Sequence, residues 1–311
     1  MKIIILTPDN PQPIGGIKQL YRLANILREG GWDARILHEK PGFRINWFHV
    51  PDIPIEYKSH IEVHGDDVIV IPEIYAHQVP SIAPGVKKVI YNQNAYYTFL
   101  NGDVQEAYYH RDVIGVLVVS DDNYQYLHFA FPNVPIYRII CGIDTDLWKP
   151  RQKEKVIAFM PRKHVEDAIQ VLSILKHRTA FDGWKIMPIH DMTELQVAEI
   201  LGRSSIFLSF GYPEGLGLPP LEAMASGCHI IGYHGGGGKE YWNKEWAKSV
   251  EVGNIIDFVL TAERDMMNFS EHYDEWSRLA TQGREWVMQH YSLEREQDVI
   301  WDVWSQILVD R

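Results

Sequence analysis

The chain has 311 residues, of which 46% are hydrophobic and 23% charged, and its formal net charge is −11. This composition is typical of a globular protein and excludes a disordered, low-complexity or repeat protein. Both halves of the chain are acidic, which disfavours a nucleic-acid partner. A local basic patch that contacts a membrane surface stays an open alternative. Chains longer than about 250 residues tend to split, so two domains are expected.

The N-terminus and the cysteines indicate the compartment. Only four apolar residues follow Met1 and Lys2, too few for a signal peptide, and no later run approaches the ~18 apolar residues of a membrane-spanning helix. Cys141 and Cys228 lie far apart, with no second cysteine or histidine at a metal-ligand spacing. The sequence therefore predicts a cytoplasmic protein with two reduced, buried cysteines and no metal site.

Apolar strand-like runs alternate with helical patterns along the first half of the chain. We expect strands at residues 2–6, 34–37, 68–71, 88–91, 116–120 and 136–140. Between the first two, apolar residues from Ile17 to Leu27 recur at helical spacing, and Gly30 ends this helix. Such continuous apolar strands are typical of a parallel sheet with helices on both faces.

The pattern starts again after a turn-rich segment that contains Pro150. New strands are expected at residues 155–160, 184–189, 206–210 and 229–233, and one or two amphipathic helices from about Gly283 to Val309. The fold class predicted is α/β, with two Rossmann-like, doubly wound domains. Their expected bounds are 1–145 and 146–295, with a helix at 296–311 completing the first. Ligands of such sheets bind at the carboxyl ends of the strands, which places the ligand in a cleft between the domains.

Residues 209–242, SFGYPEGLGLPPLEAMASGCHIIGYHGGGGKEYW, contain the clearest candidate site. Pro219 and Pro220 suit the first turn of a helix, PPLEAMAS, which follows the strand at 206–210 and ends at Gly227. A helix N-terminus offers unpaired amides and a positive dipole end, and Gly215 and Gly217 let a ligand approach the backbone closely. This combination suits a diphosphate.

Two glutamates flank the glycine-rich turn. We expect Glu222 in the first turn of the helix, where its carboxylate can accept hydrogen bonds from the vicinal hydroxyls of a ribose. Glu214 lies on the loop before the helix and can accept hydrogen bonds from a second sugar across the diphosphate. The residues alone therefore favour a nucleotide-sugar site.

PEGLGLPPLEAMASG resembles the E-x7-E signature of retaining glycosyltransferases of the GT-B fold, in the large family four, with Glu214 and Glu222 at its two glutamates. PIGGIKQLYRLANILREGGWDARIL is similar to the family's Gly-Gly loop and first helix. IICGIDTDLWKP is similar to its Asn-Gly-Ile-Asp crossover, with Cys141 in place of the asparagine. The order and spacing of all three motifs agree with the family.

The resemblance implies a metal-independent transfer of a sugar from a nucleotide-diphosphate donor to a hydroxyl acceptor, with retention and without a further cofactor. Arg162 and Lys163 are implied to stabilise the leaving diphosphate, although the family has Gly-Arg here with a lysine several residues later. Glu214 is implied to hold the transferred sugar. The remaining residues implied to bind the donor are Gly15, Gly16, Gly215, Leu216, Gly217, Leu218 and Glu222.

Other apparent motifs favour structural interpretations. Asp144-Thr145-Asp146 has the D-x-D form of metal-dependent glycosyltransferases, but it lies in the crossover, where such residues form turns. HGGGGKE has the wrong spacing and a glutamate where a Walker loop needs serine or threonine, and GLGLPP lacks the third glycine of a dinucleotide fingerprint. The acceptor side is unassigned, with Glu73 and the region of Asn94 as candidates.

We therefore expect a retaining glycosyltransferase of polysaccharide biosynthesis type, whose acceptor is a glycan, a lipid-linked molecule or a small molecule. Peripheral membrane contact stays open. Two alternatives have the same fold: an enzyme with another reaction, such as a nucleotide-sugar epimerase or a phosphorylase, and a non-catalytic protein that only binds nucleotide sugars.

Overall fold

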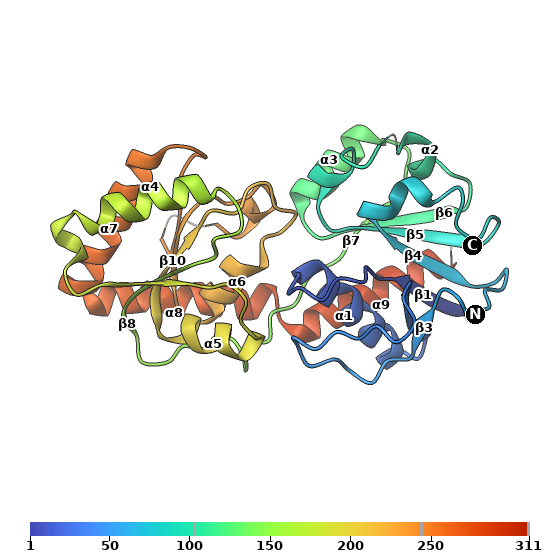
Figure 1. Cartoon of the computed structure of the whole chain (residues 1–311), viewed down its shortest axis with the longest axis horizontal. Coiled ribbons are helices and arrows are strands. Elements are labelled where there is room, and N and C mark those ends of the chain that lie inside the picture. Colours follow the sequence, from blue (N-terminus) through green and yellow to red (C-terminus); the bar gives the residue numbers. More distant parts are fainter. Residues whose placement is uncertain (103, 243–244, 310–311) are drawn as a thin grey trace. The chain divides into compact units, whose positions relative to one another are not determined.

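The computed structural model describes residues 1–102, 104–242 and 245–309. The chain divides into two compact units (Figure 1). The first runs from Met1 to Cys141 and resumes at Glu294, and the second spans Gly142–Leu293. The sequence analysis placed these two domain boundaries after residues 145 and 295. Each unit contains one sheet in which every pair of neighbouring strands is parallel, so the predicted α/β fold with two doubly wound sheets is confirmed.

The first sheet has the order β3-β2-β1-β4-β5-β6-β7. Its strands are β1 (Lys2–Leu6), β2 (Asp33–His38), β3 (Ile55–Tyr57), β4 (Val68–Pro72), β5 (Lys87–Asn92), β6 (Val113–Val118) and β7 (Ile136–Arg138). The central strand β4 is buried along its whole length, which explains its continuous apolar sequence. Strand order reverses between β1 and β4, and such a reversal is where α/β sheets bind ligands.

Helices cover both faces of the first sheet (Figure 1). They are α1 (Gly15–Glu29), α2 (Gln105–Tyr108), α3 (Asp121–Ala130) and α9 (Leu293–Val309). The last helix returns to this unit and packs beside α1, where the Trp301 indole donates to the Ile26 carbonyl at 2.8 Å and Arg22 forms an ion pair with Glu296. On the other face, η1 (Glu73–Gln78), α2 and α3 contribute to a single apolar core.

The second sheet has the order β12-β11-β10-β8-β9. Its strands are β8 (Glu154–Phe159), β9 (Lys185–Pro188), β10 (Ser204–Ser209), β11 (His229–Gly232) and β12 (Ala247–Ser249). Strand order reverses between β8 and β10, so the loops after these two strands flank the expected ligand-binding edge.

Helices also cover both faces of the second sheet (Figure 1). They are α4 (Val165–Lys176), α5 (Glu194–Arg203), α6 (Leu218–Ala225), α7 (Ile255–Glu271) and α8 (Tyr273–His290). The core on one face joins α4 and α7 to the sheet around the fully buried Phe258. The other face packs α6 against α8. No described helix is both long and apolar enough to cross a membrane.

The cysteines and two short strands complete the comparison with the sequence. Cys141 and Cys228 are free and buried, as predicted. The sequence missed β3 and β12, which have three residues each and lie at sheet edges. Both are short and incompletely buried, and neither has the continuous apolar run that identified the other strands.

Candidate functional site

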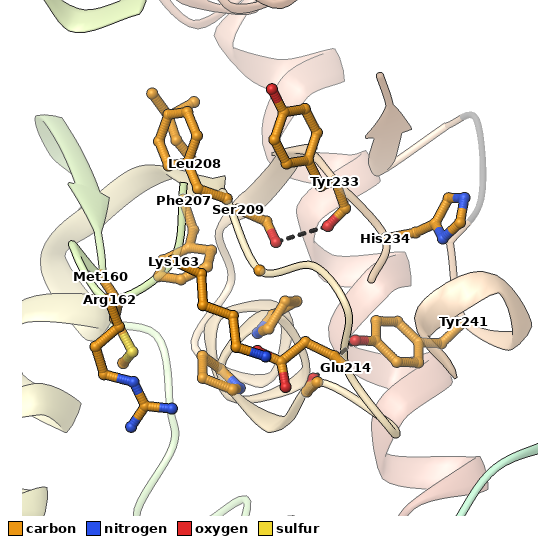
Figure 2. Close-up of a pocket in the computed structure, with 15 residues that line it drawn as sticks. Met160, Arg162, Lys163, Phe207, Leu208, Ser209, Glu214, Tyr233, His234 and Tyr241 are labelled. Carbon is orange, nitrogen blue, oxygen red and sulfur yellow. Dashed lines mark hydrogen bonds and ion pairs between the residues drawn. The ribbon is translucent and has the colours of Figure 1, made fainter. Parts of the chain in front are cut away.

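The carboxyl ends of β8, β10 and β11 lie side by side in the second sheet, and the residues that follow them enclose a pocket of about 480 Å³, open to solvent (Figure 2). The pocket lies at the reversal of strand order between β8 and β10. Its lining includes Arg162 and Lys163 after β8, Glu214 and Gly217 after β10, and His234 after β11.

Lys163 and Glu214 form an ion pair within this pocket (Figure 2). Lys163 Nζ lies 2.9 Å from Glu214 Oε1 and also donates to the carbonyl of Pro213. The two side chains are 21% and 28% exposed, so a ligand can still reach both. A partly exposed pair of this kind contributes little to stability, which leaves the lysine able to exchange the carboxylate for another anion.

Arg162 is exposed and lines the pocket, and its guanidinium lies to one side of the Lys163–Glu214 pair (Figure 2). Its backbone amide donates to the carbonyl of Met160 at 2.9 Å, which holds the turn after β8. Two adjacent residues of one turn therefore place cationic side chains at the pocket.

The loop from Glu214 to Gly217 is held against the run of four glycines, residues 235–238. Glu214 N donates to the Gly235 carbonyl at 2.7 Å, and Gly237 N donates to the Glu214 carbonyl at 3.2 Å. A Cβ on Gly237 would lie 1.8 Å from the Gly215 carbonyl oxygen, far inside contact distance. The glycine run is therefore required by the close approach of two backbone segments.

Tyr241 supports the same loop from beneath. Its hydroxyl lies 2.9 Å from the Leu216 carbonyl oxygen and 2.7 Å from that of Gly217, so one O–H serves two acceptors. The ring is 2% exposed, and burial raises the pKa of the phenol well above its ordinary value. The hydroxyl stays a neutral donor, and its hydrogen bonds to the two carbonyls fix the course of the loop.

The helix after this loop begins one residue earlier than the sequence suggested. It starts at Leu218, with Gly217 in the left-handed region at φ +84°, so Pro219 and Pro220 occupy its second and third positions. Prolines have no N–H, so the first turn supplies fewer amides to an anion than a proline-free turn would. The expectation that Glu222 lies in the first turn is wrong: it is the fifth helical residue, half-buried in the second turn.

Gly15 and Gly16 belong to the first unit, where they are the first two residues of α1. Neither has a positive φ among the described backbone. Gly16 instead meets the side chain of Gln93, whose Nε2 donates to the Gly16 carbonyl at 3.1 Å, and a Cβ there would lie 3.1 Å from Gln93 Oε1. Glu73 accepts from the Gln93 amide at 3.2 Å, so Gln93 links two candidates of the first unit, Gly16 and Glu73.

Asp144 has a turn-forming role in the crossover. Its Oδ1 accepts the backbone amides of Asp146 at 3.0 Å and Leu147 at 3.1 Å. This is the arrangement by which an aspartate stabilises a turn.

The sequence does not reveal three features in or beside the pocket. The four-glycine run is visible in the sequence, but its spacing excludes a Walker loop and gives no sign of its contact with the loop at Glu214. Tyr241 and His234 carried no signal, because nothing in the sequence indicates that they follow a strand adjacent to β10.

No family model matches the chain. An alpha-1,6-glucosyltransferase of Actinobacillus pleuropneumoniae serotype 7 is 31% identical over 193 residues, which cover 57% of this chain and 56% of that protein. The match therefore spans little more than half of the relative.

Solved structures match over nearly the whole chain at low identity. Sucrose-phosphate synthase from Thermosynechococcus elongatus has a TM-score of 0.75 at 14% identity, with 100% of both chains covered. Anabaena Alr3699/HepE in complex with UDP and glucose has a TM-score of 0.74 at 13% identity, covering 98% of this chain and 100% of that one. The fold of this chain is therefore the GT-B fold of these glycosyltransferases.

Proposed function

We propose that the protein is a retaining glycosyltransferase that transfers a sugar from a nucleotide-diphosphate donor to a hydroxyl acceptor. The observation that carries this proposal is the pocket at the β8/β10 reversal. There Arg162, Lys163 and Glu214 surround a loop whose carbonyls are held on the side of Tyr241. Cationic side chains beside loop amides suit a diphosphate, and the carboxylate suits sugar hydroxyls.

The relatives suggest which donor to test first. The 31% identical relative is named for glucosyl transfer, and Anabaena HepE is also known in complex with UDP-glucose. UDP-glucose is therefore our first candidate donor. The acceptor is a hydroxyl of a glycan, a lipid-linked molecule or a small molecule.

In this proposal the ion pair of the pocket opens when the donor binds. Lys163 exchanges the Glu214 carboxylate for phosphate oxygens, and Glu214 then accepts hydrogen bonds from the sugar that is transferred. Arg162 and the amides from Gly215 to Leu218 stabilise the remaining diphosphate charge. Glu222 accepts hydrogen bonds from the ribose.

The reaction breaks the bond between the anomeric carbon and the diphosphate oxygen, and the bonding electrons go to the diphosphate. The acceptor oxygen forms the new bond on the same face of the sugar, and its proton passes to the leaving phosphate oxygen. Glu214 acts as a sugar-binding group and not as a nucleophile. Lys163 and Arg162 contribute most where negative charge grows on the leaving group, so they stabilise the transition state more than the bound donor.

The decisive experiment follows UDP release from UDP-glucose in the presence of saccharide acceptors, with the anomeric configuration of the product read by NMR. We expect acceptor-dependent release of UDP, an α-linked product from the α-linked donor, and unchanged turnover in excess EDTA. A β-linked product would contradict retention. Interconversion of the free donor or phosphate-dependent cleavage would instead indicate an epimerase or a phosphorylase. Donor binding without release of UDP, with every acceptor tried, would indicate a binding protein.

A further inference from the structure

His164 lies in the turn that joins β8 to α4, and its backbone adopts the left-handed region at φ +45° and ψ +50°. Residues with a side chain rarely adopt this conformation, and it persists only where the surrounding structure holds it. Lys163 precedes His164 directly and lines the candidate pocket. The turn that presents Lys163 therefore depends on the contacts that hold His164.

The imidazole of His164 lies between three elements of the second unit. Its Nε2 lies 3.2 Å from the carbonyl oxygen of Tyr212, in the loop after β10, and donates to it because a carbonyl can only accept. Its Nδ1 lies 3.6 Å from Asp167 Oδ2, in the first turn of α4. Its ring meets that of Tyr233, after β11, edge to face with 5.6 Å between the centroids. The Tyr233 hydroxyl donates to the same Asp167 oxygen at 2.6 Å, so the groups around His164 are themselves held in place.

Lys163 and His164 contact successive residues of one loop. His164 donates to the carbonyl of Tyr212, while the Lys163 ammonium contacts the carbonyl of Pro213 and the carboxylate of Glu214. Lys163 and Glu214 line the pocket, whereas His164 and Tyr212 are not among the described residues that line it. The contact of His164 can therefore persist when an anion replaces the Glu214 carboxylate at Lys163.

We propose that His164 is a positioning residue, whose imidazole ties the turn after β8 to the loop after β10 and thereby fixes the place of the Lys163 ammonium at the pocket. The tie stands on the contacts described above. That Lys163 then meets the diphosphate of a nucleotide donor rests on the proposed function. Because His164 acts through Lys163 and does not touch the donor, its removal should affect donor binding only while Lys163 is present.

Lysine acetylation of the ligand-free protein tests the tie without any substrate. Brief treatment with acetic anhydride, read by peptide mass spectrometry, compares Lys163 with Lys176, which is exposed at the other end of α4 and serves as the reference within each sample. In His164→Ala the acetylation of Lys163 relative to Lys176 should rise by about two- to tenfold, the effect of losing one hydrogen bond. It should also rise in His164→Gly, since glycine keeps the left-handed backbone and only the imidazole is lost.

Two further variants complete the acetylation experiment. His164→Gln keeps a side-chain N–H donor and should stay close to the parent. His177→Ala is the matched control, because this exposed histidine follows the last residue of α4, and it should leave Lys163 as in the parent. Parental acetylation of Lys163 in His164→Ala or in His164→Gly would overturn the tie, and His164→Gly decides alone if His164→Ala does not fold.

A double-mutant cycle in calorimetric titrations with UDP tests whether His164 acts through Lys163. In the parent background, His164→Ala should weaken UDP binding by about two- to tenfold, again the effect of one hydrogen bond. In a Lys163→Ala background the same substitution should have no further effect. An equal loss in both backgrounds, or no loss in the parent background, would overturn the action through Lys163. If the parent binds no UDP at all, the proposed donor is wrong, while the acetylation experiment still decides the tie.

Discussion

The contact between the four-glycine run and the loop from Glu214 to Gly217 leads to a prediction for Gly237→Ala. The new Cβ would lie 1.8 Å from the Gly215 carbonyl oxygen, 2.4 Å from its carbonyl carbon and 2.9 Å from the Leu216 amide nitrogen. All three atoms are backbone, so no side chain can move aside to relieve the clash. The two segments must separate by about 1.2 Å or more to reach even the shortest real contacts.

This displacement has two expected costs. Forced separation of closely packed segments lowers the free energy of unfolding by about 1–3 kcal/mol. It also moves the amides from Gly215 to Leu218. A displacement of about 1 Å in a site can lower its activity on the order of a hundredfold. We therefore expect Gly237→Ala to fold, to unfold at lower denaturant, and to bind UDP about ten- to a hundredfold more weakly.

Chemical denaturation and calorimetric titration with UDP measure the two effects on the same preparation. Gly65→Ala is the matched control, because a Cβ at Gly65 meets nothing within 4 Å and its φ is not positive. Parental UDP affinity in a folded Gly237→Ala protein would refute the inferred role of this backbone contact.

Three further predictions follow from single side chains. Tyr241→Phe removes the hydroxyl that serves the Leu216 and Gly217 carbonyls, so UDP affinity should fall by about tenfold at a small cost in thermal stability; a change in stability alone would contradict its role in holding the loop. Glu222→Ala should weaken UDP binding by about 1.5–3 kcal/mol while the fold stays intact, and equal affinity by calorimetry would exclude a ribose contact. The pKa of Glu73 is raised from 4.5 to about 7 in the folded protein, so its stabilising effect is complete below pH 4.5 and is lost as the pH rises through 7. Denaturation of Glu73→Gln should therefore show a gain of about 3 kcal/mol over the parent near pH 8.5, and a gain that did not grow from pH 6 to 8.5 would contradict it.

Most of the strands, and the edge at which their carboxyl ends meet, followed from the sequence, because buried parallel strands need continuous apolar runs. Because the carboxyl ends of parallel strands share one edge, the sequence predicted that Arg162 and Glu214 lie on neighbouring loops. The short edge strand β12 has no such run, so the sequence did not predict it. The start of α6 was misplaced because proline suits several positions in a first turn, and the choice was made by Gly217 in its left-handed conformation.

The remaining features of the site depend on contacts between segments that are distant in sequence. The glycine run is needed because residues 235–238 lie against the loop at Glu214, and only the pairing of β10 with β11 brings them together. The role of Tyr241 depends on the same pairing. Glu73 was named only as a candidate for the acceptor side, since its burial and its contact with Gln93 require the folded sheet.

The central claim is that Lys163 belongs to the binding site of a nucleotide-diphosphate donor, and a calorimetric titration of UDP tests it most directly. The parent should bind UDP at a single site, and Lys163→Ala should bind it about tenfold or more weakly, because a charge-assisted contact to phosphate is lost. Arg178→Ala is the control, since Arg178 pairs with Glu263 on the surface and should leave the affinity unchanged. Equal affinity of Lys163→Ala and the parent, or no binding of UDP or any other nucleoside diphosphate to the parent, would contradict the account.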